Sequence, residues 1–476
     1  MEVGSVVAMG SSLAIGIVVW LMIWWWKSVK YLQTMKGLPP GSMGWPLLGE
    51  TLQLVYNHDQ YICSQRRRYG DIFTTNLLGA PTIICLDPDV NRFVLQNDGQ
   101  LFAPSYPKSV NDVAGRYHIL AVFGSLHKKY RGVAHSLSGN AMLKELLEDM
   151  ETFFISNLDS WEGRIVNVRK EAISMSLGIL MKESFGHSPQ EGITGLSQDL
   201  QDLFEGFFTF PVKVPGTGYW KGIKARQRVV QKLTRVIEEK RQQPQKLQDD
   251  LLGKILFAEE HQMDPPLTNE QIIDMLISVL LAGFDTTANA MALSLHFLNN
   301  HPQVLIELRK EHALIRKTKC GSTDKLTWLD YKSMNFTQNV ISETLRLANI
   351  SPGAYRKTLQ NVDCNGYTFP EGWNIITYYR ATHLDPAFFP NPKQLNPWRW
   401  QEKDSKSQYF TPFGGGKRLC PGMELARLEI SVFLHHLVTR YSWEPVEKDR
   451  PLIFPRVRMM KGYPVVVRKL RKPDYE

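Results

Sequence analysis

The longest helical pattern in the chain runs from Thr268 to about Asn300. Apolar residues recur there three and four positions apart, at Ile272, Ile273, Leu276, Ile277, Leu280 and Leu281. The preceding "TNEQ" fits a capping box, in which Thr268 bonds forward and Gln271 reaches back. The pattern is apolar on nearly every side, so we expect a buried helix of roughly 50 Å. Asp274 and Asp285 interrupt the apolar run and argue against a membrane span.

The rest of the pattern is also mainly helical. Helical spacing covers residues 337–347 and the stretch "MELARLEISVFLHHLVTRY" that follows Gly422. Strand-like runs are short and lie at residues 81–86, 366–379 and 463–470. We therefore predict a mainly α fold with small β-sheets.

The first segment is a candidate membrane anchor. No charged side chain occurs from Val3 to Trp26, which is long enough to span a bilayer as a helix. Tryptophans gather at its end and Lys27 follows, which favours an uncleaved anchor over a cleavable signal peptide. Because the positive charge follows the span, we expect the catalytic domain to lie in the cytosol. We predict an anchor at 3–26, a basic, proline-rich hinge at 27–49 and one catalytic domain at 50–476.

Charge and cysteine content narrow the function classes. The net charge is +9, but the basic residues are dispersed and no nucleic-acid motif occurs, so we expect no nucleic-acid partner. A solvated basic surface is the simplest interpretation, and an acidic partner or a membrane comes second. The five cysteines are widely spaced and form no CxxC pair, which indicates neither a zinc site nor a disulfide framework.

One cysteine stands in an unusual setting, because residues 413–422 read "FGGGKRLCPG". A lone thiol is more often a small core residue than a ligand. Cys420, however, directly precedes a predicted helix, whose first N–H groups and dipole favour a thiolate. The glycines leave room for a flat object, and Lys417 and Arg418 are suited to carboxylates on it. A haem has an iron that binds thiolate and two propionates that attract arginine.

This stretch resembles the haem-binding loop of the cytochrome P-450 superfamily, whose pattern is F-x-x-G-x-R-x-C-x-G. Phe413, Gly416, Arg418, Cys420 and Gly422 match its five fixed positions. The resemblance covers essentially the whole chain and implies the cytochrome P-450 fold behind an N-terminal transmembrane helix. It also implies that these five residues bind haem b and that Cys420 is the axial ligand of its iron.

The central helix carries "AGFDTT", residues 282–287, which resembles the oxygen-activation motif of the same family. Without that resemblance, Gly283 would simply weaken the helix, and threonine can bond the preceding turn. The resemblance implies that Thr286 and Asp285 are catalytic, holding the oxygen intermediate and relaying protons. It also implies that Ala282 and Gly283 leave space for oxygen and substrate above the haem.

Two further segments resemble a structural network of the family. "ETLR" places Glu343 and Arg346 on one helix face, and "NPWRW" supplies Arg399. Alone, the helical pair would be a surface contact worth a few tenths of a kcal/mol. The resemblance implies that the three residues form a structural lock, which we do not count as catalytic.

Other basic residues are candidate partners of the haem propionates. "GSLHKKYR", residues 124–131, resembles a family helix in which an aromatic residue and an arginine contact haem, so we expect His127 and Arg131 to do so. His127 stands where tryptophan is commoner, and an exposed basic helix is the alternative. "GAYRKT" adds Arg356.

The resemblance implies a monooxygenase that uses dioxygen and two electrons. The chain has no nicotinamide or flavin fingerprint, so the expected donor is an NADPH-cytochrome reductase at the endoplasmic reticulum membrane. Basic side chains such as Lys128, Lys129 and Lys417 would attract an acidic donor.

A closer resemblance of several stretches to one clan of the family indicates the substrate class. Stretches such as "FPVKVPGTGYWKGIKAR" resemble the plant clan that oxidises sterols, brassinosteroid precursors and terpenoids. We expect hydroxylation of a sterol or steroid-like substrate, in the side chain and within brassinosteroid biosynthesis. Triterpenoid or diterpenoid oxidation, peroxide rearrangement without a reductase, and haem transport or sensing are the alternatives. An intact "AGFDTT" argues against the last two.

Overall fold

The structure is a computed structural model of the whole chain. It describes residues 35–45, 48–136, 139–186, 195–242, 250–261, 265–319, 325–401, 408–454 and 456–470, with isolated positions between 16 and 30. The predicted anchor at 3–26 and the start of the hinge lie almost wholly outside the described residues. Among the described residues, one helix (Asn269–Asn299) is long and apolar enough to cross a membrane, and most of its apolar stretch is buried in the protein.

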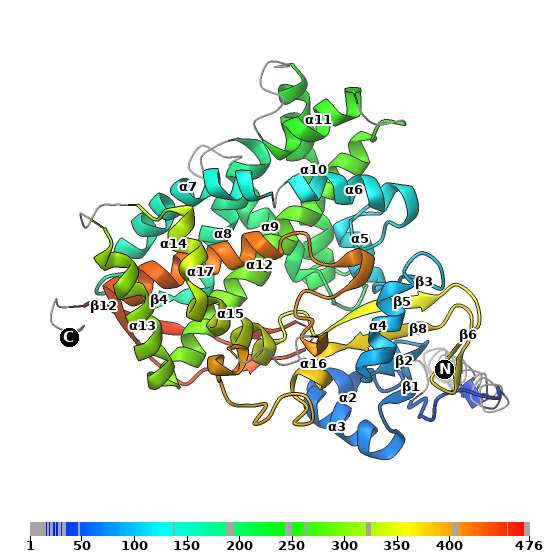
Figure 1. Cartoon of the computed structure of the whole chain (residues 1–476). Helices are drawn as coiled ribbons and strands as arrows, with labels where there is room; N and C mark the ends of the chain where they lie inside the picture. Colours follow the sequence, from blue (N-terminus) through cyan, green and yellow to red (C-terminus); the bar gives the residue numbers. More distant parts are fainter. Residues whose placement is uncertain are drawn as a thin grey trace, which may run out of the picture. The chain divides into compact units, whose positions relative to one another are not determined.

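The chain divides into two compact units (Figure 1). The first unit contains Met1–Ser105 and Gly353–Tyr379, and the second contains Tyr106–Pro352 and Arg380–Glu476. Strands dominate the first and helices the second, which confirms the predicted mixture of many helices with small sheets.

The first unit is built on a five-stranded sheet in the order β1-β2-β8-β5-β3. Leu78 and Gly79 both have positive φ, as a tight two-residue hairpin between β1 and β2 favours. The bounds in this unit are β1 (Ile72–Leu77), β2 (Ala80–Cys85), β3 (Phe102–Pro104), β5 (Gly353–Thr358), β8 (Asn374–Tyr378), the separate hairpin β6 (Val362–Cys364) and β7 (Tyr367–Phe369), α2 (Thr51–Tyr56), α3 (His58–Tyr69) and α4 (Pro88–Gln96). The predicted run at 366–379 is thus two strands in two sheets, because a turn separates β7 from β8.

The second unit is a helical body with two small sheets, ordered β4-β12-β9 and β10-β11. Its helices are α5 (Lys108–Ala114), α6 (Gly124–Ser136), α7 (Asn140–Asp159), α8 (Val168–Phe185), α9 (Leu196–Glu205), α10 (Gly218–Arg241), α11 (Leu251–His261), α12 (Asn269–Asn299), α13 (Pro302–Lys317), α14 (Trp328–Ser333), α15 (Asn335–Ala348) and α17 (Met423–Arg440). Its strands are β4 (Ile165–Asn167), β9 (Tyr441–Pro445), β10 (Pro451–Leu452), β11 (Arg458–Met459) and β12 (Pro464–Lys469). Short elements are η2 (Pro397–Trp400) and η4 (Gly416–Arg418), and α16 (Tyr379–His383) begins at the unit boundary.

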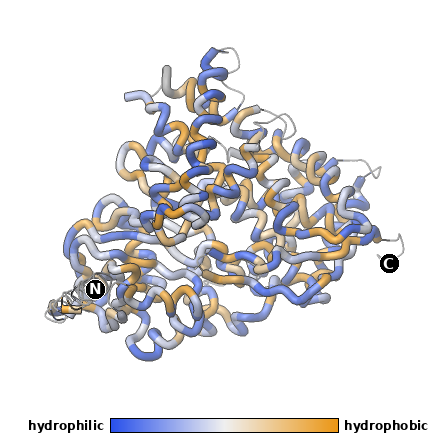
Figure 2. Tube along the Cα trace, turned by 180° about the vertical axis from the view of Figure 1, so that it is seen from behind, coloured by the Kyte–Doolittle hydropathy of each residue, from blue (hydrophilic) through white to orange (hydrophobic). Residues whose placement is uncertain are grey.

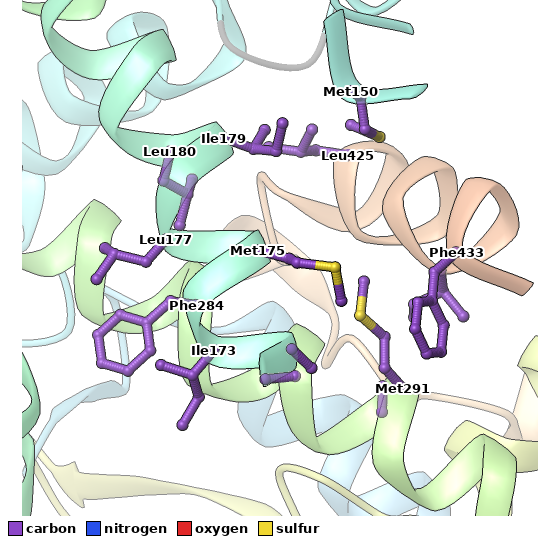
Figure 3. Packing of buried hydrophobic residues seen from close by; sticks show 14 of the residues in the cluster. Met150, Ile173, Met175, Leu177, Ile179, Leu180, Phe284, Met291, Leu425 and Phe433 are labelled. Atoms are coloured by element: carbon purple, nitrogen blue, oxygen red, sulfur yellow. The ribbon is translucent and has the colours of Figure 1, made fainter. Parts of the chain in front are cut away.

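Helix α12 is the core element of the second unit. Its capping box is confirmed: Thr268 N–H donates to Gln271 Oε1 over 2.9 Å, and Gln271 N–H donates to Thr268 Oγ1 over 3.3 Å. Figure 2 shows apolar and polar positions alternating along the helices of this unit. Met175 of α8, Met291 of α12 and Phe433 of α17 turn toward one another in the core (Figure 3). Two of these helices adjoin the candidate site, because α12 contains Ala282 and Thr286 and α17 follows Cys420.

Candidate active site

The Cys420 segment forms a closed loop that leads into α17. The Cys420 N–H donates to the Phe413 carbonyl over 3.0 Å, and α17 begins at Met423. Gly414 and Gly416 have φ of 74° and 64°, where a side chain would be strained. Two of the glycines are therefore required by the turn itself.

The surroundings of this loop fit a flat cofactor. None of the residues from 409 to 424 is fully buried, although the loop leads into the core helix α17. Gly422 has φ of −90°, and a Cβ added there would meet nothing within 4 Å. Neither the backbone nor a protein neighbour thus explains this glycine, whereas a group lying beside it would.

Two arginines fasten the loop to the α6 region. Arg131 of α6 donates a hydrogen bond to the Leu419 carbonyl, next to Cys420. Arg418 donates to the carbonyls of Ile119 over 3.3 Å and Val122 over 2.7 Å. These two predicted haem-binding residues therefore lie at the Cys420 loop. Their contacts with propionates stay a prediction.

Opposing electrostatic effects act on the Cys420 thiol. Burial raises the pKa of its thiol, while the Gly422 N–H and the Arg131 guanidinium oppose that shift. A thiol with a raised pKa keeps its proton, whereas a bound cation would replace the proton and stabilise the thiolate.

The "AGFDTT" segment opens one face of an otherwise buried helix. Ala282 and Thr286, one turn apart, are exposed in the middle of α12, whose neighbouring positions are mostly buried. The Thr286 hydroxyl donates to the Ala282 carbonyl over 2.6 Å. A hydroxyl and a small residue thus border an open space at the predicted position.

Gly283 has a different explanation from the predicted one. A Cβ at Gly283 would come within 2.5 Å of Leu180 Cδ1 on α8, so the glycine allows α8 and α12 to approach closely. A role for Gly283 in cofactor binding stays a prediction.

Asp285 is buried in an ion network away from bulk water. One of its oxygens accepts from Arg169, and from Arg456 over 3.2 Å, and the other accepts from Asn289 over 2.9 Å. Arg456 also bonds Glu205 over 2.6 Å. A proton relay through Asp285 therefore requires these contacts to rearrange. Its catalytic role remains a prediction.

The predicted structural lock is present. The Glu343 carboxylate accepts from Arg346 over 2.8 and 2.9 Å and from Arg399 over 2.9 Å. Trp400 Nε1 and the Asn396 N–H complete its shell over 3.1 and 3.0 Å. Glu343 and Arg346 are fully buried, so the helical pair is not a surface contact.

The two remaining candidates lie in different units. His127 is buried on α6, one turn before Arg131. Arg356 is on β5 in the first unit, where it is buried and pairs with Asp98 over 3.3 Å. Their haem contacts are untested predictions.

Several partners of the site residues could not be identified from local sequence patterns. Arg169 and Arg456 are 116 and 171 positions from Asp285, so no local pattern could identify them. Asn289 follows Asp285 by one helical turn, and that spacing was the available clue. Trp400 lies within "NPWRW", a segment that predicted only its neighbour Arg399 as a partner of Glu343.

Comparison with known proteins identifies the class. Residues 39–466 match the family model described as Cytochrome P450. The chain is 40% identical to "Cytochrome P450 85A1" of Oryza sativa subsp. japonica over 462 residues, which cover 96% of this chain and 98% of that protein. It is 39% identical to "Cholesterol 22-hydroxylase CYP90B27" of Paris polyphylla, covering 92% and 93% of the two chains. A solved structure, "Retinoic acid bound cyanobacterial CYP120A1", superimposes with a TM-score of 0.84 at 26% identity, covering 91% of this chain and 99% of that one.

The chain therefore belongs to the cytochrome P450 family, and its fold is the P450 fold. This confirms the predicted family and the predicted enzyme class, a monooxygenase. The family implies a haem held by a cysteine thiolate.

Proposed function

We propose that this protein is a membrane-anchored monooxygenase that hydroxylates the side chain of a sterol or steroid-like substrate in brassinosteroid biosynthesis. The observation that carries the haem-thiolate part is the Cys420 loop: a lone thiol before a helix, with open space beside Gly422. The similarity to a cholesterol 22-hydroxylase supports the substrate class.

Haem b fits the residues of the second unit. Cys420 would hold the iron, Phe413, Gly416 and Gly422 would lie beside the ring, and Arg418 would meet a propionate. Arg131 and His127 would add positive charge on α6, and a propionate contact of Arg356 stays a prediction from the sequence. When bound, the haem supplies the redox chemistry that inserts an oxygen atom into an unactivated C–H bond.

The chain itself supplies position and protons. Thr286 borders the open face of α12, where its hydroxyl can donate to a ligand instead of to the Ala282 carbonyl. Asp285 would deliver protons if its bonds to Arg169 and Arg456 opened. Ala282 contributes only a methyl group, which leaves room for an apolar substrate.

A terpenoid oxidase is the second candidate. The solved structure with a TM-score of 0.84 has retinoic acid bound, an isoprenoid that is largely hydrocarbon and carries one carboxylate. A triterpenoid or diterpenoid would fill an apolar site in the same way as a sterol. A peroxide-rearranging enzyme without a reductase is less favoured, because it would not need the proton delivery that we assign to Thr286 and Asp285.

Electron supply and location belong to the same proposal. An NADPH-cytochrome reductase would supply electrons, docking on basic residues that include the exposed Lys128 and Lys417. The anchor at 3–26 would hold the protein in the endoplasmic reticulum membrane, with the catalytic domain in the cytosol.

The test is turnover of a substrate panel by the full chain in microsomes. Reductase, NADPH and a set of sterols, triterpenoids and diterpenoids are supplied, and the products are identified. Side-chain hydroxylation of a sterol is the expected result. Oxidation of terpenoids alone would support the second candidate, and product formed without reductase would overturn the monooxygenase proposal.

A further inference from the structure

The segment from Ala114 to Val122 joins the two halves of the candidate site. The Ile119 carbonyl accepts from Arg418 of the cysteine loop over 3.3 Å. The Ile119 N–H donates to Ser278 Oγ on α12 over 3.1 Å. One residue thus connects the Cys420 loop to the helix that carries Ala282 and Thr286.

A buried carboxylate holds the same segment one turn earlier on α12. Asp274 is fully buried and accepts the Tyr117 N–H over 2.8 Å. It also pairs with Arg226 of α10 over 2.5 Å, and Arg226 donates to the Ala114 carbonyl over 2.8 Å. The carboxylate therefore ties α10, α12 and the 114–122 segment together.

Gly115 shows how closely the segment approaches Asp274. Its φ is +107°, and a Cβ there would come within 2.1 Å of Asp274 Oδ1. Both the backbone conformation and the available space therefore require glycine at this position. The segment is fixed against the carboxylate rather than resting loosely on it.

The tethers precede the exposed residues of α12 in one series. Asp274, Ser278, Ala282 and Thr286 follow one another at four-residue intervals, so they form a stripe that winds gradually around the helix, by about 40° per step. The first two hold the segment, and the last two are exposed. The segment is thus held against α12 one turn before the exposed Ala282.

We propose that Asp274 is a positioning residue that determines where the substrate is hydroxylated. This inference rests on the proposed function. By fixing the 114–122 segment, Asp274 sets how far a rigid, apolar substrate can advance along the α12 stripe, and hence which carbon lies at Thr286. If the only role of this ion pair were to stabilise the fold, an apolar contact could replace it, because burying two charges costs desolvation free energy.

Asp250 provides a matched control. It is also buried, it also pairs with a cation of α10, Lys240, and it also accepts one backbone N–H, from Gly253 over 2.8 Å. Asp250 bonds Lys240 of α10 and the Gly253 N–H of α11, and neither residue lies in the 114–122 segment. Asp274→Asn and Asp250→Asn therefore remove the same charge from equivalent ion pairs, one tied to that segment and one not.

The first measurement is hydrogen exchange of the full chain, which needs no turnover. In Asp274→Asn, exchange in the peptide covering residues 114–122 should rise about tenfold, the effect of losing one charge-assisted bond. Asp250→Asn should leave that peptide unchanged. Equal exchange in the two variants would overturn the proposed tether.

The second measurement is the product distribution with the sterol that the wild type hydroxylates. In Asp274→Asn, the ratio of main to minor hydroxylation sites should fall by roughly tenfold, with a smaller change in total turnover. Asp250→Asn should keep the wild-type ratio. An unchanged ratio in Asp274→Asn would overturn the inference, whereas a wild type inactive on every sterol would refute the proposed function instead. If Asp274→Asn does not fold, Ser278→Ala removes the second tether. The same two measurements are then made on Ser278→Ala, with the same expected results.

Discussion

Two regions of the second unit use arginines in opposite ways. Around Glu343, every donor has an acceptor within the protein: two arginines, an indole and a backbone N–H converge on one buried carboxylate. Around Cys420, Arg131 and Arg418 donate to backbone carbonyls, and no residue from 409 to 424 is fully buried. The first region is complete as folded protein, and the second has the form of a site that a cofactor completes.

The largest effect is expected at Cys420. Cys420→Ala should abolish the red-shifted Soret band of the reduced carbon monoxide complex, because no other described thiol stands in this loop. The half-buried Cys364 of the first unit is the control, and Cys364→Ala should keep the band. A normal spectrum in Cys420→Ala would show that the two regions do not differ as we describe.

Disrupting the network around Glu343 should instead reduce the stability of the protein. Glu343→Ala leaves Arg346 buried without its carboxylate, so we expect a loss of about 3–5 kcal/mol in the free energy of unfolding. Thermal unfolding of the variant would measure it. Glu444→Ala, which breaks an exposed pair with Arg468, should cost less than about 1 kcal/mol. Similar losses in both variants would contradict a structural lock at Glu343.

Thr286 tests the open face of α12. Thr286→Ala removes the hydroxyl but little volume, so folding and the carbon monoxide spectrum should be retained. Product formed per NADPH consumed should fall by roughly tenfold or more, because proton delivery is impaired. Thr286→Ser keeps the hydroxyl and should restore most of the coupling. Unchanged coupling in Thr286→Ala would remove Thr286 from the catalytic group.

Glu429 of α17 sharpens the comparison, because it is a buried acid without the arginines that serve Glu343. Burial raises the pKa of Glu429 to about 8 from its ordinary 4.5, against a smaller opposing effect of the Ser176 hydroxyl. Between these pH values the unfolded chain has lost this proton and the folded chain keeps it, so the free energy of unfolding falls as pH rises. The limiting slope is about 1.4 kcal/mol per pH unit.

Glu429→Gln removes this titration. Its stability relative to the wild type should therefore increase steadily from pH 5 to pH 8, as measured by denaturant unfolding at several pH values. A constant difference between the two proteins over that interval would mean that Glu429 is ionised in the folded state.

Local patterns in the sequence predicted local structure well. The Thr268 capping box, the helix after Cys420 and the pairing of Glu343 with Arg346 all depend on residues close in sequence, and the structure contains all three. The P450 fold followed from the match of Phe413 to Gly422 with the family motif and is confirmed by comparison.

Contacts between distant segments were not predictable in the same way. Asp274 and Asp285 were evident as charges in an apolar helix, but their partners Arg226, Arg169 and Arg456 lie 48 to 171 positions away. Tertiary packing selects such partners, and no periodicity encodes them. The contact of Gly283 with Leu180 could not be predicted for the same reason, since Leu180 belongs to α8.

The packing of Gly283 against Leu180 also bears on redesign of this protein. The two adjacent small residues of "AGFDTT" are not equivalent targets for a library that aims to change substrate range. A larger residue at Ala282 enters open space, whereas any side chain at Gly283 meets the Leu180 side chain of α8, which would have to move. Variation should therefore be concentrated at position 282, with position 283 left as glycine.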